Sequence, residues 1–263
     1  MITLASDFAT PYPAAMRGVV LGRTDARLVD VAHDFPRGDV RAAAFWLREL
    51  LPYFPPAVHL VVVDPGVGTD RNAIVVRVGD HALVAPDNGV LCPVARELAA
   101  GVPLESFVLD DDHEELRPAR TGRSRAKKSA TFHGRDVFAP AAADVHEVGV
   151  ENLERLPYLS PVEDCVDLTL PVATVHDGCA TGETLVVDDF GNVITNVPGS
   201  FLEDRETVVA NGERVPVGET FAAVEPGERL ATVGSHGYVE LDVNQGRGEA
   251  AFDLEPGARV VLE

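Results

Sequence analysis

The spacing of apolar residues changes in a regular way along roughly the first 155 residues. Short runs rich in β-branched residues alternate with segments whose apolar residues recur at helical spacing. The runs predict strands at Ile2 to Ala5, Arg27 to His33, Leu60 to Val63, Ala73 to Val78 and Ala82 to Ala85. The periodic segments predict helices at Ala14 to Leu21, Asp39 to Leu51, around Val94 to Leu98 and soon after His133. This alternation favours an α/β fold with a mostly parallel sheet and helices on both faces.

The pattern changes after Leu156 and Pro157. From Val166 onward, short apolar runs are separated by turns such as Asn211-Gly212 and Pro256-Gly257, and helical periodicity is nearly absent. Such a pattern is typical of an all-β, antiparallel and barrel-like domain. We therefore predict an α/β domain over residues 1–160 and a β-barrel domain over residues 163–263.

Two acidic residues stand directly after predicted strands. The run Leu60 to Val63 is typical of a strand buried on both faces, and it stops at Asp64. Asp7 follows the first predicted strand in a similar way. Ligands bind at the carboxyl ends of strands in α/β sheets, and Arg71 is close enough in sequence to fold back and pair with Asp64. From this segment alone, a functional site and a capped turn are equally good interpretations.

His133 lies between Phe132 and Gly134. A lone histidine in such a place is more often structural than catalytic, but a neighbouring arginine and aspartate would reverse that expectation. Asp87 and Asn88, in a turn sequence before the third predicted helix, are interpreted as structural residues that cap it.

Two stretches of the second domain differ from simple strands and turns. One groups an aromatic ring with carboxylates and an amide around a glycine, and the other places a hydroxyl between two glycines whose backbone donors are open to a ligand carboxylate. Together they are typical of a surface that recognises a polar, partly aromatic small molecule. The candidate binding residues are Asp188, Phe190, Asn192, Ser235 and His236.

The chain is strongly acidic. Its 263 residues include 42 Asp and Glu against 22 Lys and Arg, a formal charge of −20 at pH 7 that is spread along the chain. Such a surface disfavours nucleic acid and anionic lipid as partners, and it predicts a halophilic source. The one basic run, between Arg117 and Lys128, is interpreted as a solvated loop without a catalytic role.

Neither a membrane span nor the basic start of a signal peptide is visible, so we expect a cytoplasmic protein. Cys92, Cys165 and Cys179 lack C-x-x-C spacing, which predicts inert core thiols instead of a disulfide framework or a zinc site. The histidines show no ligand-type pair, and no metal is expected.

Six motifs occur along the chain in a fixed order. They are Ser6-Asp7-Phe8, Val63 to Gly68 with Arg71, Pro86 to Gly89, Thr131 to Asp136, Phe190 to Asn192 with Thr195-Asn196, and Ser235 to Tyr238. Together they resemble the S-adenosyl-L-methionine (SAM) hydroxide adenosyltransferase family, the water-using branch of the superfamily that contains the fluorinating and chlorinating enzymes. The resemblance covers nearly the whole chain. It implies an amino-terminal α/β domain joined to a β-barrel, in a homotrimer whose active sites lie between neighbouring subunits.

The resemblance also implies an activity and roles for residues. SAM would be cleaved by water or hydroxide at C5′, without a cofactor, to adenosine and L-methionine. Asp64, Arg71 and His133 would form the catalytic trio, and the residues leave open whether His133 or Asp64 is the base. The implied substrate contacts are Asp7 at the ribose, Phe132, Asn192 and Phe221 around adenosine, and Asp188 and Ser235 at the methionine part.

Two other functions remain open. In halogenating relatives, hydroxyl-bearing residues stand at the positions of Asp64 and Val67, and the fluorinating branch has serine at that of Gly134. A carboxylate at the nucleophile pocket repels a halide, which argues against SAM-dependent chloride or fluoride transfer. The other alternative is a protein that binds SAM or adenosine without turnover, and the presence of all three trio residues disfavours it.

Overall fold

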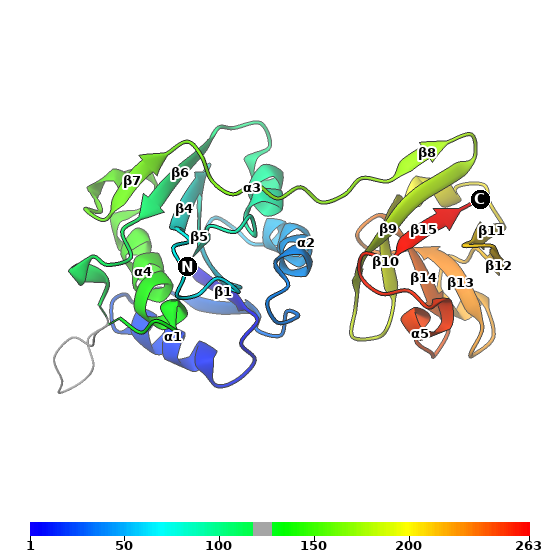
Figure 1. Cartoon of the computed structure of the whole chain (residues 1–263), viewed down its shortest axis with the longest axis horizontal. Helices are drawn as coiled ribbons and strands as arrows, with labels where there is room; N and C mark the ends of the chain where they lie inside the picture. The colour runs from blue at the N-terminus through cyan, green and yellow to red at the C-terminus, as the bar shows by residue number, and fades with distance from the viewer. Residues whose placement is uncertain (118–127) are drawn as a thin grey trace. The chain divides into compact units, whose positions relative to one another are not determined.

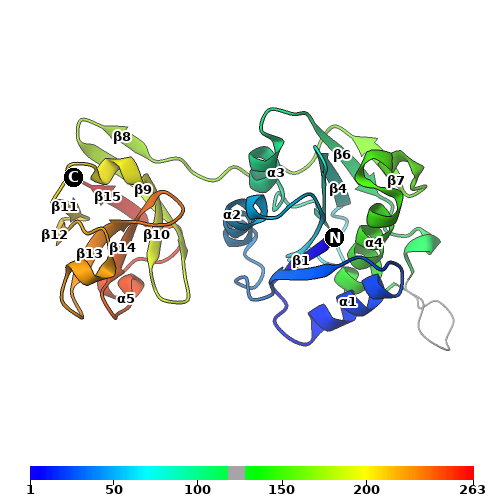
Figure 2. The same ribbon diagram turned by 180° about the vertical axis from the view of Figure 1, so that it is seen from behind.

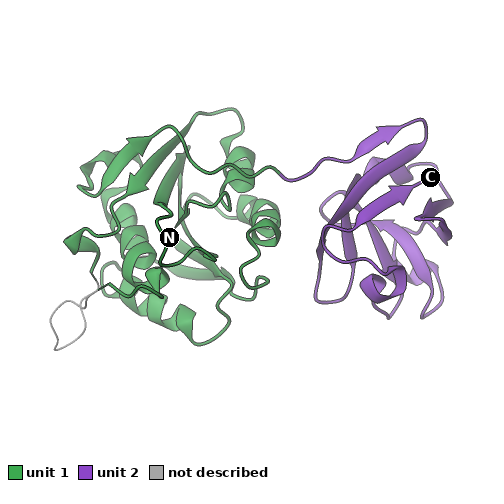
Figure 3. Cartoon of the chain, viewed as in Figure 1, with its two compact units in different colours: residues 1–169 green, residues 170–263 purple. Residues whose placement is uncertain are grey.

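The computed structural model of the protein describes residues 1–117 and 128–263, and it contains two compact units. The first unit comprises residues 1–169 and the second residues 170–263 (Figure 3). Each unit has a hydrophobic core of its own, so each is described by itself. No helix within the described ranges is long and apolar enough to cross a membrane.

The first unit is built around a seven-stranded sheet with the strand order β2-β1-β3-β5-β4-β6-β7. The strands are β1 (Ile2–Ser6), β2 (Leu28–Ala32), β3 (Val58–Val62), β4 (Ala73–Val78), β5 (His81–Pro86), β6 (Leu104–Leu109) and β7 (Leu159–Val162). All five predicted strands are present, and β3 lies inside the sheet as its buried sequence predicts. β6 and β7 were not predicted, and half or more of the residues in each are at least partly exposed.

The sheet is mixed, so the prediction of a mostly parallel sheet was only partly correct. Neighbouring strands from β2 to β5 are parallel, whereas β5, β4, β6 and β7 pair antiparallel. The reason is the short link between β4 and β5, where Gly79 adopts a left-handed φ of +53°. Such a tight turn permits a hairpin but cannot carry the crossover that parallel strands require.

Helices cover both faces of this sheet, as predicted (Figure 1, Figure 2). The helices are α1 (Tyr12–Leu21) and α4 (Ala139–Val148) on one face, and α2 (Val40–Leu50) and α3 (Cys92–Ala99) on the other. Short helical turns are η1 (Leu51–Tyr53), η2 (Glu114–Leu116), η3 (Gly134–Phe138) and η4 (Val150–Arg155). α1 begins at Tyr12, two residues before its predicted start, because a proline in the first turn costs no helical hydrogen bond.

The second unit is an eight-stranded antiparallel sheet that nearly closes on itself, which confirms the predicted barrel-like domain. Its strands are β8 (Thr174–His176), β9 (Cys179–Val187), β10 (Val193–Pro198), β11 (Thr207–Ala210), β12 (Glu213–Pro216), β13 (Arg229–Val233), β14 (Tyr238–Val243) and β15 (Arg259–Leu262). The order is β12-β11-β15-β9-β10-β14-β13, with β8 beside β9. A bridge from Val217 to Ala231 brings the two ends of this order together. The short helices are η5 (Gly199–Leu202), η6 (Phe221–Ala223) and α5 (Gly248–Phe252).

Candidate active site

Asp7 and Asp64 lie at the same edge of the first sheet. β1 and β3 are parallel neighbours, and Ser6 pairs with Val62 at their carboxyl ends. The residues that follow these two strands therefore emerge side by side. This is the edge at which α/β sheets bind ligands.

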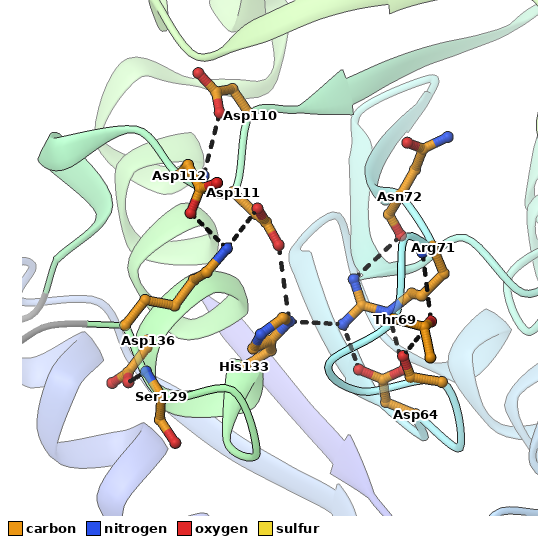
Figure 4. Close-up of polar contacts among 12 residues, drawn as sticks. Asp64, Thr69, Arg71, Asn72, Asp110, Asp111, Asp112, Ser129, His133 and Asp136 are labelled. Carbon is orange, nitrogen blue, oxygen red and sulfur yellow. Dashed lines mark hydrogen bonds and ion pairs between the residues drawn. The ribbon is translucent and has the colours of Figure 1, made fainter.

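The side chains of Asp64, Arg71 and His133 meet at this edge (Figure 4). Nε of Arg71 donates to Oδ1 of Asp64 at 2.9 Å, and Nη2 donates to Oδ2. The same Nη2 lies 3.0 Å from Nδ1 of His133. Because a guanidinium only donates, Nδ1 is the acceptor and the proton of the neutral ring is assigned to Nε2. The predicted pairing of Arg71 with Asp64 is confirmed, and His133 joins it from a distant part of the chain.

Two local features hold this cluster together. The loop after β3 passes so close to the segment before His133 that a Cβ on Gly68 would lie 2.7 Å from the carbonyl oxygen of Ala130. Gly68 also has a φ of +81°, which glycine adopts without strain. The guanidinium of Arg71 lies over the buried ring of Phe138, 5.1 Å from its centroid. Phe138 belongs to η3, the turn that follows His133, so one segment supplies both the imidazole and a platform for the guanidinium.

The surroundings of His133 keep its ring neutral. The residue is only 4% exposed. Burial lowers the pKa of His133 below its ordinary 6.5, and the charge of Arg71 lowers it further. Asp111 acts in the opposite direction, with Oδ2 at 3.7 Å from Nδ1. At pH 7 the imidazole is therefore uncharged and able to accept a proton.

Sequence reasoning missed Asp111. It stands in the acidic run of residues 110–115, and such a run does not reveal which carboxylate points inward. Its neighbours in space, His133 and Lys128, are both more than fifteen residues away in the chain, so no local spacing indicates the contact.

A cavity of about 770 Å³ lies beside the cluster, a volume typical of small-molecule sites. All of its walls come from the first unit. They include the loop Gly68 to Ala73, the acidic residues Asp110 to Asp112, Lys128, His133 and Tyr158. The cavity therefore contains the guanidinium and the imidazole of the trio in its lining.

Asp7 has one carboxylate oxygen available at the neighbouring strand end. Oδ2 accepts a hydrogen bond from the backbone of Gly38 at 2.7 Å. Oδ1 is buried and has no hydrogen-bond partner among the described residues, which makes it a candidate for contact with a ligand hydroxyl. The rings of Phe8, which follows Asp7 in the chain, Tyr12 and the distant Phe132 pack edge to face, with centroid separations of 5.3 to 6.0 Å. Phe132 is thus half-buried in an aromatic cluster that sequence reasoning did not predict.

Asp87 and Asn88 hold backbone segments in place. Nδ2 of Asn88 donates to the carbonyl of Val63 at 2.9 Å and so fixes the backbone next to Asp64. Asp87 accepts a hydrogen bond from a backbone N–H beyond β7 at 2.8 Å. The structural interpretation of both residues is confirmed. The predicted helix cap is wrong, because α3 begins only at Cys92 and Oδ1 of Asn88 accepts a hydrogen bond from the backbone N–H of Val90, ahead of the helix, at 3.1 Å.

In the second unit, Asp188 organises the loop between β9 and β10. Its Oδ1 accepts from the backbone N–H groups of Phe190 and Asn192, both at 2.9 Å, and its Oδ2 accepts from the Asn192 side chain at 3.0 Å. The ring of Phe190 remains 79% exposed. An aromatic ring held outward by a braced loop is suited to contact with another surface or a ligand.

Ser235 and His236 lie in the turn between β13 and β14. Ser235 is exposed, and Nδ1 of His236 lies 3.4 Å from Oε1 of Glu240. Phe221, in η6, is 43% exposed. The structure places the candidate residues in two groups, one on each unit. The first group is Asp7, Asp64, Arg71, Phe132 and His133, and the second is Asp188, Phe190, Asn192, Phe221, Ser235 and His236.

Two buried carboxyl groups of β14, Glu240 and Asp242, were also missed. Asp242 is fully buried, and neither of its oxygens has a hydrogen-bond partner among the described residues. Burial, assisted by the neighbouring carboxylates of Glu240 and Asp188, raises the pKa of Asp242 to about 8. Strand alternation places both side chains on one face, but burial of that face is a tertiary property.

The predictions for cysteines and the basic run were only partly correct. The three cysteines are free, but each is half-buried instead of belonging to the core. Burial raises the pKa of the Cys92 and Cys165 thiols, which keeps them protonated. Residues 118–127 of the basic run lie outside the described residues. Lys128 lines the cavity instead of belonging to a solvated loop. No group of three or more His, Cys, Asp or Glu in the described part of the chain could hold a metal ion.

Comparison with known proteins identifies close relatives. Residues 2–156 match the family model of the SAM hydroxide adenosyltransferase N-terminal domain, and residues 182–261 match that of the C-terminal domain. A Salinispora tropica protein named (R)-S-adenosyl-L-methionine hydrolase is 40% identical over 98% of this chain and 96% of its own length. A Thermus thermophilus protein of the same name is 38% identical, over 98% and 97%. The crystal structure of an uncharacterized conserved protein from Thermotoga maritima superposes with a TM-score of 0.82 and 31% identity, covering 100% of this chain and 99% of that one.

Proposed function

The chain belongs to the SAM hydroxide adenosyltransferase family, and we propose that it hydrolyses S-adenosyl-L-methionine to adenosine and L-methionine. The observation that carries this proposal is the contact of Arg71 with both Asp64 and His133 beside the cavity. Hydrolysis of a sulfonium requires an aligned water molecule and a proton acceptor, and this cluster contains groups suited to both. The names of the relatives from Salinispora tropica and Thermus thermophilus support the same reaction.

The proposed chemistry is direct displacement at C5′. A lone pair of the water oxygen forms the new bond to C5′, while the electron pair of the C5′–S bond remains on sulfur. Sulfur leaves as the neutral thioether of methionine, and one proton of the attacking water passes to the enzyme. Because the leaving group departs uncharged, neither a general acid nor a cofactor is required. Alignment of the water about 3 Å from the carbon supplies much of the acceleration.

His133 is the better candidate base. Asp64 accepts two hydrogen bonds from Arg71, one on each carboxylate oxygen, so its role is to orient the guanidinium, whereas His133 makes a single contact with Arg71 that one water molecule can replace. Neutral His133 has its lone pair on Nδ1, the nitrogen that Arg71 contacts. We propose that the attacking water takes the place of Arg71 as the partner of Nδ1. Arg71, oriented by Asp64, then stabilises the developing hydroxide.

The substrate contacts follow the two groups of residues. Asp7 binds the ribose hydroxyls through its unpaired Oδ1, and Phe132 packs against the nucleoside. The residues on the second unit contact adenosine and the methionine part, and we propose that a homotrimer supplies them from a neighbouring subunit. The exposed rings of Phe190 and Phe221 support a role for that surface in such an assembly.

The test is incubation of the purified protein with SAM in ¹⁸O-labelled water at high salt, followed by mass spectrometry. Wild type is expected to form adenosine that carries ¹⁸O at the 5′ position. His133→Ala is expected to lose at least roughly 10²-fold in rate, the usual contribution of a positioned base. His176→Ala is a matched control, because that imidazole is on the second unit and 77% exposed, and its rate is expected to equal that of wild type.

Other products would contradict hydrolysis in distinct ways. Bound SAM recovered intact would identify a binding protein, and a 5′-chlorinated nucleoside in chloride buffer would identify halide transfer. The relatives' name specifies the (R) sulfonium epimer, so both epimers are supplied separately. We propose the same preference here, and equal rates with the two epimers would contradict it.

A cytoplasmic location and a halophilic source are part of the proposal. The three cysteines are free, which fits a reducing compartment. The charge of −20 fits a protein that functions in concentrated salt.

A further inference from the structure

We propose that Asp111 is the counter-ion of His133 when that ring accepts the proton of the attacking water, and that Lys128 fixes Asp111 in position. The inference rests on the proposed role of His133 as the base. Oδ2 of Asp111 lies 3.7 Å from Nδ1 of His133, and Oδ1 lies 2.7 Å from Nζ of Lys128. One carboxylate therefore connects the imidazole to an ammonium group (Figure 4).

The charges around His133 explain why a counter-ion is required. A proton on Nδ1 would place a positive ring beside the guanidinium of Arg71 in a buried site, since Nη2 lies only 3.0 Å from Nδ1 before water enters. Like charges at such separations strongly disfavour protonation. Asp64 is already occupied by Arg71, so it offers little compensation. Among the described residues, Asp111 is the only carboxylate within 4.0 Å of a ring nitrogen of His133.

These charged groups come from three segments of the first unit. Asp64 and Arg71 belong to the loop between β3 and β4, the aspartates follow β6, and Lys128 precedes η3. The groups that act on His133 are Arg71, Asp111, Lys128 and Asp64, and Asp112 lies beside them. Asp111 and Asp64 raise the pKa of His133, whereas Arg71 and Lys128 lower it.

Lys128 is itself anchored to the segment that holds His133. The N–H of Ser129 donates to Oδ2 of Asp136 at 2.8 Å. Asp136 is fully buried in η3 and paired with Arg135. The backbone beside Lys128 is therefore held against the same turn that follows His133. This arrangement orients the carboxylate of Asp111, although the ammonium also opposes the charge that His133 acquires.

The two residues make opposite predictions for the titration of His133. Asp111→Asn removes a negative charge at nearly constant shape. The pKa of His133 followed by NMR, and the acidic limb of the kcat profile, are expected to move down by about one pH unit. kcat on the plateau falls by up to about 10-fold, because an imidazole that is one pH unit less basic is a weaker proton acceptor. Lys128→Met removes a positive charge, so the pKa of His133 and the acidic limb of the kcat profile are expected to move up. kcat on the plateau is expected to fall, because Asp111 loses the ammonium that fixes it in position.

Asp112→Asn is the matched control. Asp112 lies at the same 2.7 Å from Nζ of Lys128, but its side chain is 80% exposed, so water screens its charge. Asp112→Asn is expected to shift the pKa of His133 by only a small fraction of the shift caused by Asp111→Asn. The melting temperatures of Asp111→Asn, Lys128→Met and Asp112→Asn are all expected to be near that of wild type. If Asp111 had a purely structural role, Asp111→Asn and Lys128→Met would not shift the pKa of His133 in opposite directions.

The NMR titration does not depend on turnover. If the pKa of His133 is the same in wild type, Asp111→Asn and Lys128→Met, the counter-ion proposal is wrong even when wild type produces adenosine. If wild type produces no adenosine, the proposed hydrolysis fails instead, and the counter-ion role fails with it.

Discussion

The guanidinium of Arg71 donates hydrogen bonds to two side chains at once, Asp64 and His133. Its Nε and Nη2 bind the two oxygens of Asp64, and Nη2 also reaches Nδ1 of His133. A planar fork of fixed donors suits this geometry, and the single ammonium of a lysine could not reproduce it. The arrangement depends on how closely the loop after β3 approaches the segment before His133. Gly68 is the residue of this loop that lies against that segment.

Gly68→Ala is expected to lower kcat by about 10²-fold, because displacement of a catalytic group by about 1 Å has effects of that size. A Cβ at this position would lie 2.7 Å from a backbone carbonyl oxygen, so the loop carrying Arg71 has to move away from His133. Steady-state kinetics with SAM measure the effect.

Gly79→Ala provides the control for backbone strain. Gly79 also has a positive φ, +53°, but a Cβ there would meet nothing within 4 Å. It is expected to lose about 1 kcal/mol of stability with kcat unchanged. Equal kinetic effects of the two substitutions would show that strain, and not the contact with Ala130, controls the site.

At the scale of elements, three parallel strands are connected by a chain of polar side chains that is buried at Thr3 and His59 and half-buried at His81. Oγ1 of Thr3 in β1 lies 2.8 Å from Nδ1 of His59 in β3. Nε2 of His59 lies 2.9 Å from Nδ1 of His81 in β5. Burial, followed by the influence of His81, lowers the pKa of His59 to about 3. The sheet that carries the site thus contains an imidazole that remains neutral in the folded state.

This histidine predicts a loss of stability in acid. The unfolded chain binds a proton at His59 near pH 6.5, whereas the folded chain resists protonation down to about pH 3. The titration of His59 therefore costs no stability above pH 6.5, and the free energy of unfolding declines as pH falls from 6.5 toward 3. At pH 5 the loss is about 2 kcal/mol, from 1.5 pH units at about 1.36 kcal/mol each.

Urea unfolding followed by the fluorescence of Trp46, the only tryptophan, measures the first unit. His59→Gln keeps a polar side chain without this titration. The stability difference between pH 7 and pH 5 is expected to be about 2 kcal/mol smaller in the variant than in wild type. An unchanged difference would show that His59 does not carry the acid sensitivity.

At the scale of the whole molecule, the charge of −20 is the dominant feature. Many carboxylates repel one another in the folded chain, and the repulsion weakens as the screening length falls from about 10 Å at 0.1 M salt to about 3 Å at 1 M. The overall acidity therefore makes stability dependent on salt, independently of the active site.

Raising NaCl from 0.1 to 1 M is expected to raise the Tm by about 5 °C, which corresponds to a stabilisation of about 1 to 2 kcal/mol. Calorimetry measures the shift, and sucrose at equal osmolality is the non-ionic control. An equal rise in sucrose would exclude charge screening as the cause. Sedimentation of the same samples measures the mass of the active species, and full activity in a monomer would contradict the proposed trimer.

The fold was largely predictable because its signals are local. Apolar spacing within windows of a few residues indicated five of the seven strands in the first unit and all four of its α-helices. The change of pattern after Pro157 indicated the barrel-like unit. β6 and β7 were missed because their partly exposed residues lack a clear apolar period. The antiparallel half of the sheet was missed because strand direction depends on pairing as well as on periodicity.

The sequence by itself determined the two-unit architecture and the pairing of Asp64 with Arg71, since seven residues and a turn are enough to bring those side chains together. That His133 joins them was implied by the family resemblance, but the spacing of residues did not indicate it and the tertiary structure decided it. Only the tertiary structure decided that Asp111 and Lys128 lie beside His133. These groups come from segments far apart in the chain, and helix packing on the sheet brings them together. Periodicity encodes which face of an element is buried, whereas a contact between distant side chains exists only once those faces are packed.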